Sequence, residues 1–247
     1  MRPWNSIRIS ECKESLVSLP SSILRIEPHP YFSLNAPYGK GEDPWRLRVD
    51  VVKRLLLAQE YLRKQEESLC LAIFDAWRPI AVQAFMVDYS IDKECISRGI
   101  NKLDKTNKKV LQDIKDEVSK FWAPPSLNPS TPPPHSTGAA VDLTLATSDG
   151  SYLNMGGDID AVSDISKPDY YSDHAQDDYE LCSFNNRRIL LSKVMSHAGF
   201  IQHPNEWWHY SYGDQLWAWK SNNPKAIYGA WDEKRSSFTK VSPNTSI

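Results

Sequence analysis

The chain has 247 residues, of which 40% are hydrophobic and 24% charged, a balance typical of a globular protein rather than a disordered one. This length is long for one ordinary domain and short for two. The 29 lysines and arginines nearly offset the 31 aspartates and glutamates, leaving a formal net charge of −2. A chain without net basicity has little to hold a phosphate backbone, so we expect no nucleic-acid partner and a small or neutral substrate.

Apolar residues are distributed without a membrane or secretory signal. No apolar run approaches the length of about 20 residues that spans a bilayer. Charges and prolines interrupt the amino-terminal segment every few residues, so it lacks the apolar centre of a signal peptide. The four cysteines form no metal-knuckle or dense disulfide pattern and predict reduced thiols: Cys12, Cys70, Cys95 and Cys182. We therefore expect a cytoplasmic protein without membrane contact.

The first half of the chain predicts short strands, helices and one buried strand. Residues 1–42 contain several prolines and predict irregular or short-stranded structure. Asp43 can cap a helix, and apolar residues at helical spacing predict that this helix runs to about Gln65. The apolar run Leu69–Phe74 predicts a buried strand, and a second helix is predicted from near Pro79.

The second half begins with a predicted helix over residues 108–121. A proline-rich loop follows over 123–134, where the chain can neither continue a helix nor enter a sheet interior. Alternation of small or apolar with polar residues predicts a strand over 139–145. The remaining predicted elements are a long polar stretch over 147–183, a helix over 185–198, and short strands over 200–203 and 207–212.

These elements predict the fold class and the domain limits. The strands are few and the last two are close in sequence, which favours an α+β fold with a small, mostly antiparallel sheet and flanking helices. No linker separates two cores, so we expect a single domain over residues 1–232. Residues 233–247 are polar and predict a flexible tail.

Two histidines and an aspartate form a candidate metal site. Asp142 follows His135 by seven positions, which on an uninterrupted strand would put the two side chains on opposite faces. Gly138 allows the chain to bend between them, so both can reach one point. With His209 they make a common three-ligand zinc set that leaves a position for water. The alternative is that each histidine is an ordinary core or surface residue.

Glu206 and Arg78 could carry the chemistry around such a metal. Glu206 and His209 reach one point only if Glu206 lies in a turn before the strand. The adjacent Trp207 and Trp208 would desolvate the carboxylate and raise its pKa, which suits a proton shuttle; the alternative is a solvated turn residue. Arg78 could stabilise an oxyanion, or it could form a surface ion pair.

Three sequence blocks together resemble one family of zinc peptidases. They are Asp75–Pro79 (DAWRP), His135–Leu145 (HSTGAAVDLTL) and Glu206–Tyr210 (EWWHY). In this order, over roughly residues 40–230, they resemble the zinc-dependent D-alanyl-D-alanine dipeptidases. That family has the small α+β zinc-peptidase fold shared with muramoyl carboxypeptidases and the Hedgehog signalling domain, and the resemblance implies the same fold here.

The resemblance also implies a reaction and a role for each site residue. It implies one zinc ion per chain, with three ligands: His135, Asp142 and His209. Glu206 would be the general base and acid, Arg78 would stabilise the transition state, and Asp160 would receive the substrate's ammonium group. The implied reaction is hydrolysis of D-Ala-D-Ala to two D-alanines by a metal-activated water.

One departure from the family and two other functions bear on this interpretation. Many members have serines where Pro133 and Pro134 precede His135, so a hydroxyl that could touch the substrate is missing. We expect substrate orientation or preference to differ and metal binding to survive.

A peptidoglycan stem-peptide carboxypeptidase or endopeptidase would use the same zinc site, and a non-catalytic zinc-containing binding module would need neither Glu206 nor Arg78. Both a monomer and a homo-oligomer are compatible with the sequence.

Overall fold

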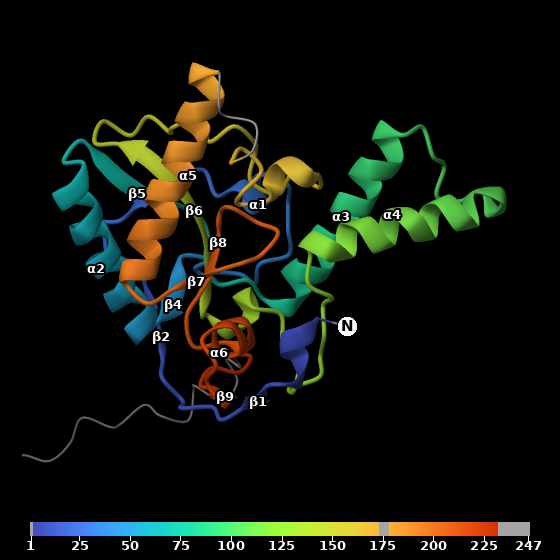
Figure 1. The fold of residues 1–247 in the computed structure, drawn as a ribbon. Coiled ribbons are helices and arrows are strands. Elements are labelled where there is room, and N and C mark those ends of the chain that lie inside the picture. Colours follow the sequence, from blue (N-terminus) through green and yellow to red (C-terminus); the bar gives the residue numbers. More distant parts are fainter. Residues whose placement is uncertain (1, 173–177, 232–247) are drawn as a thin grey trace, which may run out of the picture.

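The computed structural model describes residues 2–172 and 178–231 (Figure 1). Its α-helices are α1 (Pro30–Ser33), α2 (Val49–Gln65), α3 (Ile80–Ser97), α4 (Lys108–Phe121), α5 (Tyr179–His197) and α6 (Gln215–Lys220). Short 3-10 helices are η1 (Pro3–Ser6), η2 (Lys105–Asn107), η3 (His135–Thr137) and η4 (Asp164–Ser166). The predicted tail over 233–247 lies outside the described residues, and the single domain over 1–232 stays a prediction.

The strands are short and come from the whole length of the chain. They are β1 (Arg8–Ile9), β2 (Leu16–Ser18), β3 (Leu24–Arg25), β4 (Arg46–Arg48), β5 (Leu69–Asp75), β6 (Ala140–Thr147), β7 (Ile201–Gln202), β8 (His209–Ser211) and β9 (Lys225–Ala226). Within the described residues, five of them form a sheet in the order β3-β5-β6-β8-β7. In this sheet β3 and β5 are parallel and the other neighbours antiparallel, which confirms the α+β class with a small, mostly antiparallel sheet.

Two predicted helix starts are wrong, each because of a local interaction that the apolar pattern does not reveal. The backbone N–H of Trp45 donates to Oδ1 of Asp43 at 2.9 Å, so Asp43 closes a turn instead of capping a helix. The next residues pair with β2 as strand β4, and α2 begins only at Val49. α5 begins earlier than predicted, at Tyr179, because Asp178 caps it by accepting two backbone N–H groups.

The hydrophobic core lies between the sheet and the helix pair α2 and α5 (Figure 1). Val141, Leu143 and Leu145 of β6 belong to this core and are fully buried. Because side chains alternate along a strand, Asp142 between the first two of them points to the opposite face. That face is therefore where a site on β6 must lie.

Helices α3 and α4 form an arm that projects away from the sheet (Figure 1). They pack on each other through a separate apolar cluster that includes Val82, Met86, Ile114 and Val118. Trp122, the residue after α4, is also part of this cluster and is 5% exposed. The arm thus brings an indole to the side of the sheet that carries Asp142.

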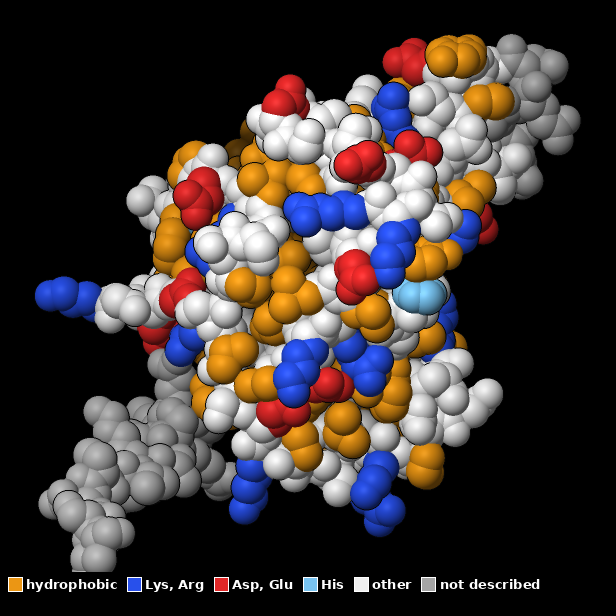
Figure 2. Space-filling model, turned by 90° about the vertical axis from the view of Figure 1, so that its left-hand side faces the viewer, with side chains coloured by type: hydrophobic (Ala, Val, Ile, Leu, Met, Phe, Trp, Pro, Cys, Tyr) orange, Lys and Arg blue, Asp and Glu red, His pale blue; other side chains and the backbone are white. Residues whose placement is uncertain are grey.

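The described surface has mixed charge. In the face drawn in Figure 2, lysine and arginine side chains are interspersed with aspartate and glutamate, and hydrophobic side chains lie in groups between them. This mixing is what the near-balanced charge of the sequence predicts. Among residues 2–172 and 178–231, every helix is too short or too polar to cross a membrane.

Candidate metal centre

Three ionisable side chains form a row across the sheet, on the face away from α2 and α5. In the strand register, Asp142 of β6 lies opposite Asp75 of β5 and opposite His209 of β8. Directly opposite residues of antiparallel strands share a face, so the three side chains are neighbours. They are 0–4% exposed, and buried charges of this kind are stable only when they are paired or bound to a cation.

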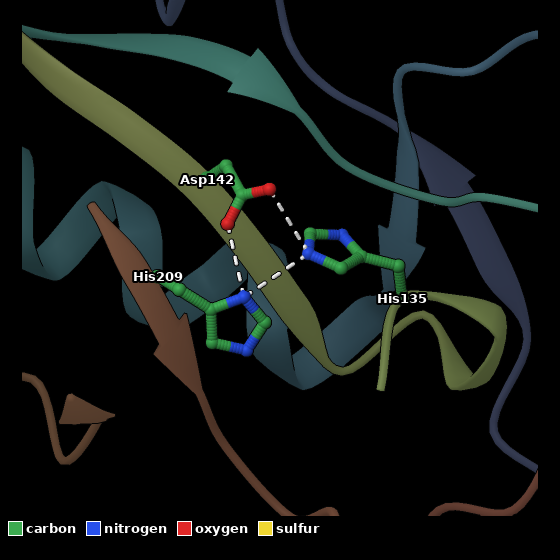
Figure 3. A group of neighbouring side chains, drawn as sticks. All are labelled: His135, Asp142 and His209. Carbon is green, nitrogen blue, oxygen red and sulfur yellow. Dashed lines mark hydrogen bonds and ion pairs between the residues drawn. The ribbon is translucent and has the colours of Figure 1, made fainter. Parts of the chain in front are cut away.

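His135 lies in the short helix η3, which precedes β6 in the chain, and its side chain joins this row (Figure 3). The predicted bend lies at Gly138, whose φ of 72° is in the left-handed region. The positive φ favours glycine, and a Cβ at this position would also force the side chain of Leu16 to move. The bend turns the imidazole of His135 back toward Asp142.

Three ligand atoms converge at this point (Figure 3). Oδ2 of Asp142 lies 3.1 Å from Nε2 of His135, and Oδ1 lies 3.0 Å from Nδ1 of His209. The two histidine nitrogens are 3.2 Å apart. Among the described residues, these are the histidine, cysteine and carboxylate side chains grouped closely enough to hold a metal ion.

Neighbouring groups fix the protonation of both imidazoles. Nδ1 of His135 lies 2.8 Å from the carbonyl oxygen of Ala76, which can only accept, so the proton of a neutral ring is on Nδ1. On His209, Nε2 faces Oγ of Ser211 at 3.4 Å, and that hydroxyl donates to Asp214 at 2.8 Å. Both nitrogens that face Asp142 therefore present lone pairs, and these supporting hydrogen bonds are typical of metal-binding histidines.

The donor set fits a divalent cation. Burial raises the pKa of Asp142, and protonated His135 and His209 would outweigh this and hold its pKa far below the usual range. With both rings neutral, the carboxylate faces two lone pairs with no proton between them, so a cation bound there would take over the stabilisation of its charge. Two imidazoles and one carboxylate are ligands that Zn²⁺ favours, and three protein ligands leave room for water.

Glu206 lies in the turn before β8, the position that it needs to reach the same point as His209. Its Oε2 is 3.6 Å from Nδ1 of His209, and its Oε1 is 3.3 Å from Nδ1 of His203. The side chain is 6% exposed, and Trp208 beside it lines the same cavity. Burial first, and then the charge of Asp142, raise the pKa of Glu206 to about 8. Such a carboxyl group can both take and return a proton near neutral pH.

Arg78 is buried and held on several sides, rather than forming a surface ion pair. Its Nε and Nη2 donate to Oδ2 of Asp75 at 3.0 and 2.7 Å, and Nη1 donates to Gln83 at 2.9 Å. Nη2 also contacts Oδ2 of Asp142 at 3.3 Å, which places the guanidinium beside the candidate metal ligands. A guanidinium has five N–H donors, so one N–H of Nη1 remains for a substrate oxygen.

Asp160 reaches the site through Tyr31. The Tyr31 hydroxyl accepts from Nη2 of Arg78 at 3.0 Å and donates to Oδ2 of Asp160 at 2.9 Å. Asp160 has a φ of 67°, a strained conformation for a residue with a side chain that recurs at functional positions. Burial first, and then the charge of Asp142, raise the pKa of Asp160 to about 7, so a cation beside it would restore its charge.

The structure thus brings all six predicted site residues together, and it adds residues that the sequence did not single out. Asp75 stood in a quoted motif without a role, yet it is the carboxylate that holds Arg78. Tyr31 and Arg2 had no local signal, because their partners are far away in the chain, and Gln83, five positions after Arg78, lies outside the quoted motif. The site cavity is narrow, about 30 Å³, and is lined by Arg2, Arg78, Trp122, Asp160, Glu206 and the three candidate ligands among others.

The family model and the sequence relatives indicate one family. The family model described as D-ala-D-ala dipeptidase (Peptidase_M15) matches residues 27–227. A D-alanyl-D-alanine dipeptidase of Synechocystis sp. is 42% identical over 229 residues, which cover 90% of this chain and 91% of that relative. One of Enterococcus faecium is 30% identical over 67% of this chain and 72% of its own length. A zinc complex of the vancomycin resistance D,D-pentapeptidase VanY aligns with 87% of this chain and 86% of its own, at 14% identity and a TM-score of 0.47.

Proposed function

Because the chain belongs to the D-Ala-D-Ala dipeptidase family, and is therefore a peptidase, we propose that it hydrolyses free D-Ala-D-Ala to two D-alanines with one zinc ion per chain. Membership confirms the resemblance that the three sequence blocks indicate. The observation that carries the proposal is the convergence of His135, Asp142 and His209 beside Glu206, a buried carboxyl group with a raised pKa.

In this proposal His135, Asp142 and His209 hold the zinc ion and Glu206 moves the protons. Zinc bound there would supply Lewis acidity, which polarises the scissile carbonyl and makes a water easier to deprotonate. Glu206 accepts a proton from the attacking water and later donates it to the nitrogen of the leaving D-alanine. The environment of Glu206 suits both steps, since a carboxyl group with a pKa near neutrality exchanges protons in either direction.

Arg78 stabilises the negative charge that develops on the carbonyl oxygen. Asp75 and Gln83 hold its guanidinium, and this fixed orientation is what makes such a donor effective, since nothing has to reorganise during the reaction. The free N–H of Nη1 is the donor available for this oxygen. Loss of one such donor typically costs about 10²–10³ in rate.

Asp160 binds the ammonium group of the dipeptide, and the hydroxyl of Tyr31 holds the carboxylate of Asp160 in place. A carboxylate at this position would pair with a free amino terminus close to the scissile bond. This feature supports a free dipeptide as substrate, rather than a peptidoglycan stem peptide. Pro134 lines the cavity where the family resemblance implies a serine, so an apolar ring stands in place of a hydroxyl that could touch the substrate.

The test is to incubate purified protein of known metal content with three substrates: D-Ala-D-Ala, L-Ala-L-Ala and a stem pentapeptide. We expect alanine release from D-Ala-D-Ala alone, one zinc per chain, and loss of activity on chelation with recovery on adding zinc. Glu206→Gln should retain zinc and lose activity, since only the proton carrier is removed.

Two outcomes would refute the proposal. Release from the pentapeptide would indicate a wall-trimming peptidase with the same metal site. Stoichiometric zinc without release from any of the three would indicate a binding module or another substrate. Full dipeptidase activity of Glu206→Gln would refute only the role proposed for Glu206.

A further inference from the structure

Arg2 lines the candidate metal cavity, although it lies far from every other site residue in the sequence. Its side chain is partly buried beside the end of α4, where Nη2 donates to the backbone carbonyls of Phe121 at 3.3 Å and Ser119 at 3.5 Å. These bonds orient the guanidinium without neutralising it. Among residues 2–172 and 178–231, no carboxylate lies within ion-pair distance of Arg2.

The segment that carries Arg2 is firmly docked. Trp4 is 7% exposed and packs edge-on against the imidazole of His203, with 5.6 Å between ring centroids. Nε2 of Gln215 donates to the carbonyl of Ile7 at 2.6 Å, and β1 pairs with β9. An arginine on such a rigid segment keeps its position at little cost in entropy, which is what a substrate-binding residue requires.

Arg2 and Asp160 line the same cavity as the metal ligands but are held by different groups. The guanidinium of Arg2 donates to backbone carbonyls beside the end of α4, whereas Asp160 accepts from the hydroxyl of Tyr31. Burial lowers the pKa of Arg2, but an arginine stays charged at neutral pH. The cavity therefore presents, together with the metal ligands, a carboxylate and a guanidinium that has no ion-pair partner among the described residues.

This charge pattern matches a dipeptide zwitterion, whose ammonium and carboxylate lie on either side of the peptide bond. We propose that Arg2 binds the carboxylate of the second residue of the substrate. The proposal rests on the proposed dipeptidase function, in which Asp160 binds the ammonium group and the scissile carbonyl faces Arg78. Together, Arg2 and Asp160 would select peptides of two residues by requiring both charged ends at a fixed separation.

The experiment pairs a variant of Arg2 with a substrate that lacks the carboxylate. The zinc-loaded full chain, Arg2→Gln and Arg2→Lys are assayed with D-Ala-D-Ala and with its carboxamide, D-Ala-D-Ala-NH₂. Arg8→Gln is the matched control, because Arg8 lies on the same segment but is exposed and outside the cavity. We expect Arg2→Gln to raise KM for D-Ala-D-Ala and lower kcat/KM about 10- to 100-fold, with kcat little changed.

The carboxamide separates recognition from structure. Wild type should cleave it less efficiently than D-Ala-D-Ala by a similar factor, and Arg2→Gln should cleave both alike. Arg2→Lys should recover part of the discrimination, and Arg8→Gln should behave as wild type. Equal losses on both substrates would assign Arg2 a merely structural role and overturn the proposal, as would unchanged kinetics.

A binding measurement keeps the proposal testable apart from turnover. Calorimetric titration of D-Ala-D-Ala and its carboxamide into zinc-loaded Glu206→Gln, with and without Arg2→Gln, measures recognition without catalysis. We expect Arg2 to favour the carboxylate form about 10- to 100-fold in Kd. Equal affinities for the two ligands would overturn the proposal even if wild type is an active dipeptidase. If wild type cleaves neither substrate but the titrations still show a preference for the carboxylate that depends on Arg2, the role of Arg2 is supported and only the proposed function is refuted.

Discussion

Replacing Asp75 with asparagine tests whether a buried charge holds Arg78 in place. Oδ2 of Asp75 accepts two hydrogen bonds from Arg78, at 3.0 and 2.7 Å, and Oδ1 lies 3.2 Å from Nε2 of His29. Burial alone would raise the pKa of Asp75, but Arg78, His29 and His135 together outweigh it and keep the pKa below its usual value. Asparagine preserves the size of the side chain, removes its charge and turns one oxygen into a donor.

The magnitude follows from these contacts. Asp75 is 0% exposed, so water cannot replace a lost partner. Removing one member of a buried ion pair costs about 3–5 kcal/mol. In a domain of this size, about 1 kcal/mol corresponds to roughly 2–4 °C in Tm. We therefore expect Asp75→Asn to lower Tm by about 6–20 °C. We also expect it to lower kcat by about 10²–10³, because Arg78 no longer faces the oxyanion in a fixed orientation.

The assay combines thermal and urea unfolding with steady-state kinetics on D-Ala-D-Ala, at matched zinc content. Asp50→Asn is the control, since Oδ2 of Asp50 accepts from Nε of Arg54 at the same 3.0 Å, but on the surface. Exposed pairs contribute about 0–1 kcal/mol, so this control should lose little stability and no activity.

Either of two results would show the reasoning to be wrong. If Asp75→Asn and Asp50→Asn unfold at the same urea concentration as wild type, the buried charge does not hold the site. If Asp75→Asn loses stability while kcat stays unchanged, Asp75 supports the fold and does not position Arg78.

Three further predictions concern the groups around this centre. Since the pKa of Asp160 is raised to about 7, its carboxylate loses its charge below that pH. The kcat/KM of wild type on D-Ala-D-Ala, divided by that of Asp160→Asn, should therefore fall as the pH falls through 7. A ratio that does not change with pH would contradict this. Gly138→Ala should cost about 2–3 kcal/mol in urea unfolding, through strain and contact with a neighbouring side chain, and Gly150→Ala, whose φ is 91° in open space, about 1 kcal/mol. Asp214→Asn should weaken zinc binding about 10- to 100-fold in competition with a chelating dye, because His209 loses its supporting chain of hydrogen bonds; unchanged affinity would refute that role.

The elements best predicted from the sequence are those whose signal is local. The apolar run at 69–74 has few alternatives to a buried strand, and the helix predicted over 108–121 has the bounds of α4. Glu206 could be placed in a turn because the spacing to His209 is incompatible with a straight strand. In these cases the residues that decide the structure are neighbours in the chain.

The remaining features depend on contacts between distant residues. Arg46–Arg48 becomes a strand because β2 lies beside it, although its own pattern fits a helix. Tyr31 touches Asp160 across 129 positions of the sequence, and nothing near either residue announces the contact. Arg2 enters the cavity because Trp4 anchors its segment against the far end of the chain. The electrostatics of the site therefore emerge only from the fold.

The row formed by Asp75, Asp142 and His209 has a consequence for how the chain folds. Sliding β8 along β6 by a single residue would turn His209 to the opposite face of the sheet and separate it from Asp142. A cation bound by His135, Asp142 and His209 requires the correct alignment of β8 with β6, so it would favour that alignment over a shifted one. At a free concentration 100 times its Kd, such an ion adds about 3 kcal/mol to the aligned state. Because β8 has only three residues, a bound metal ion would help to set its alignment with β6.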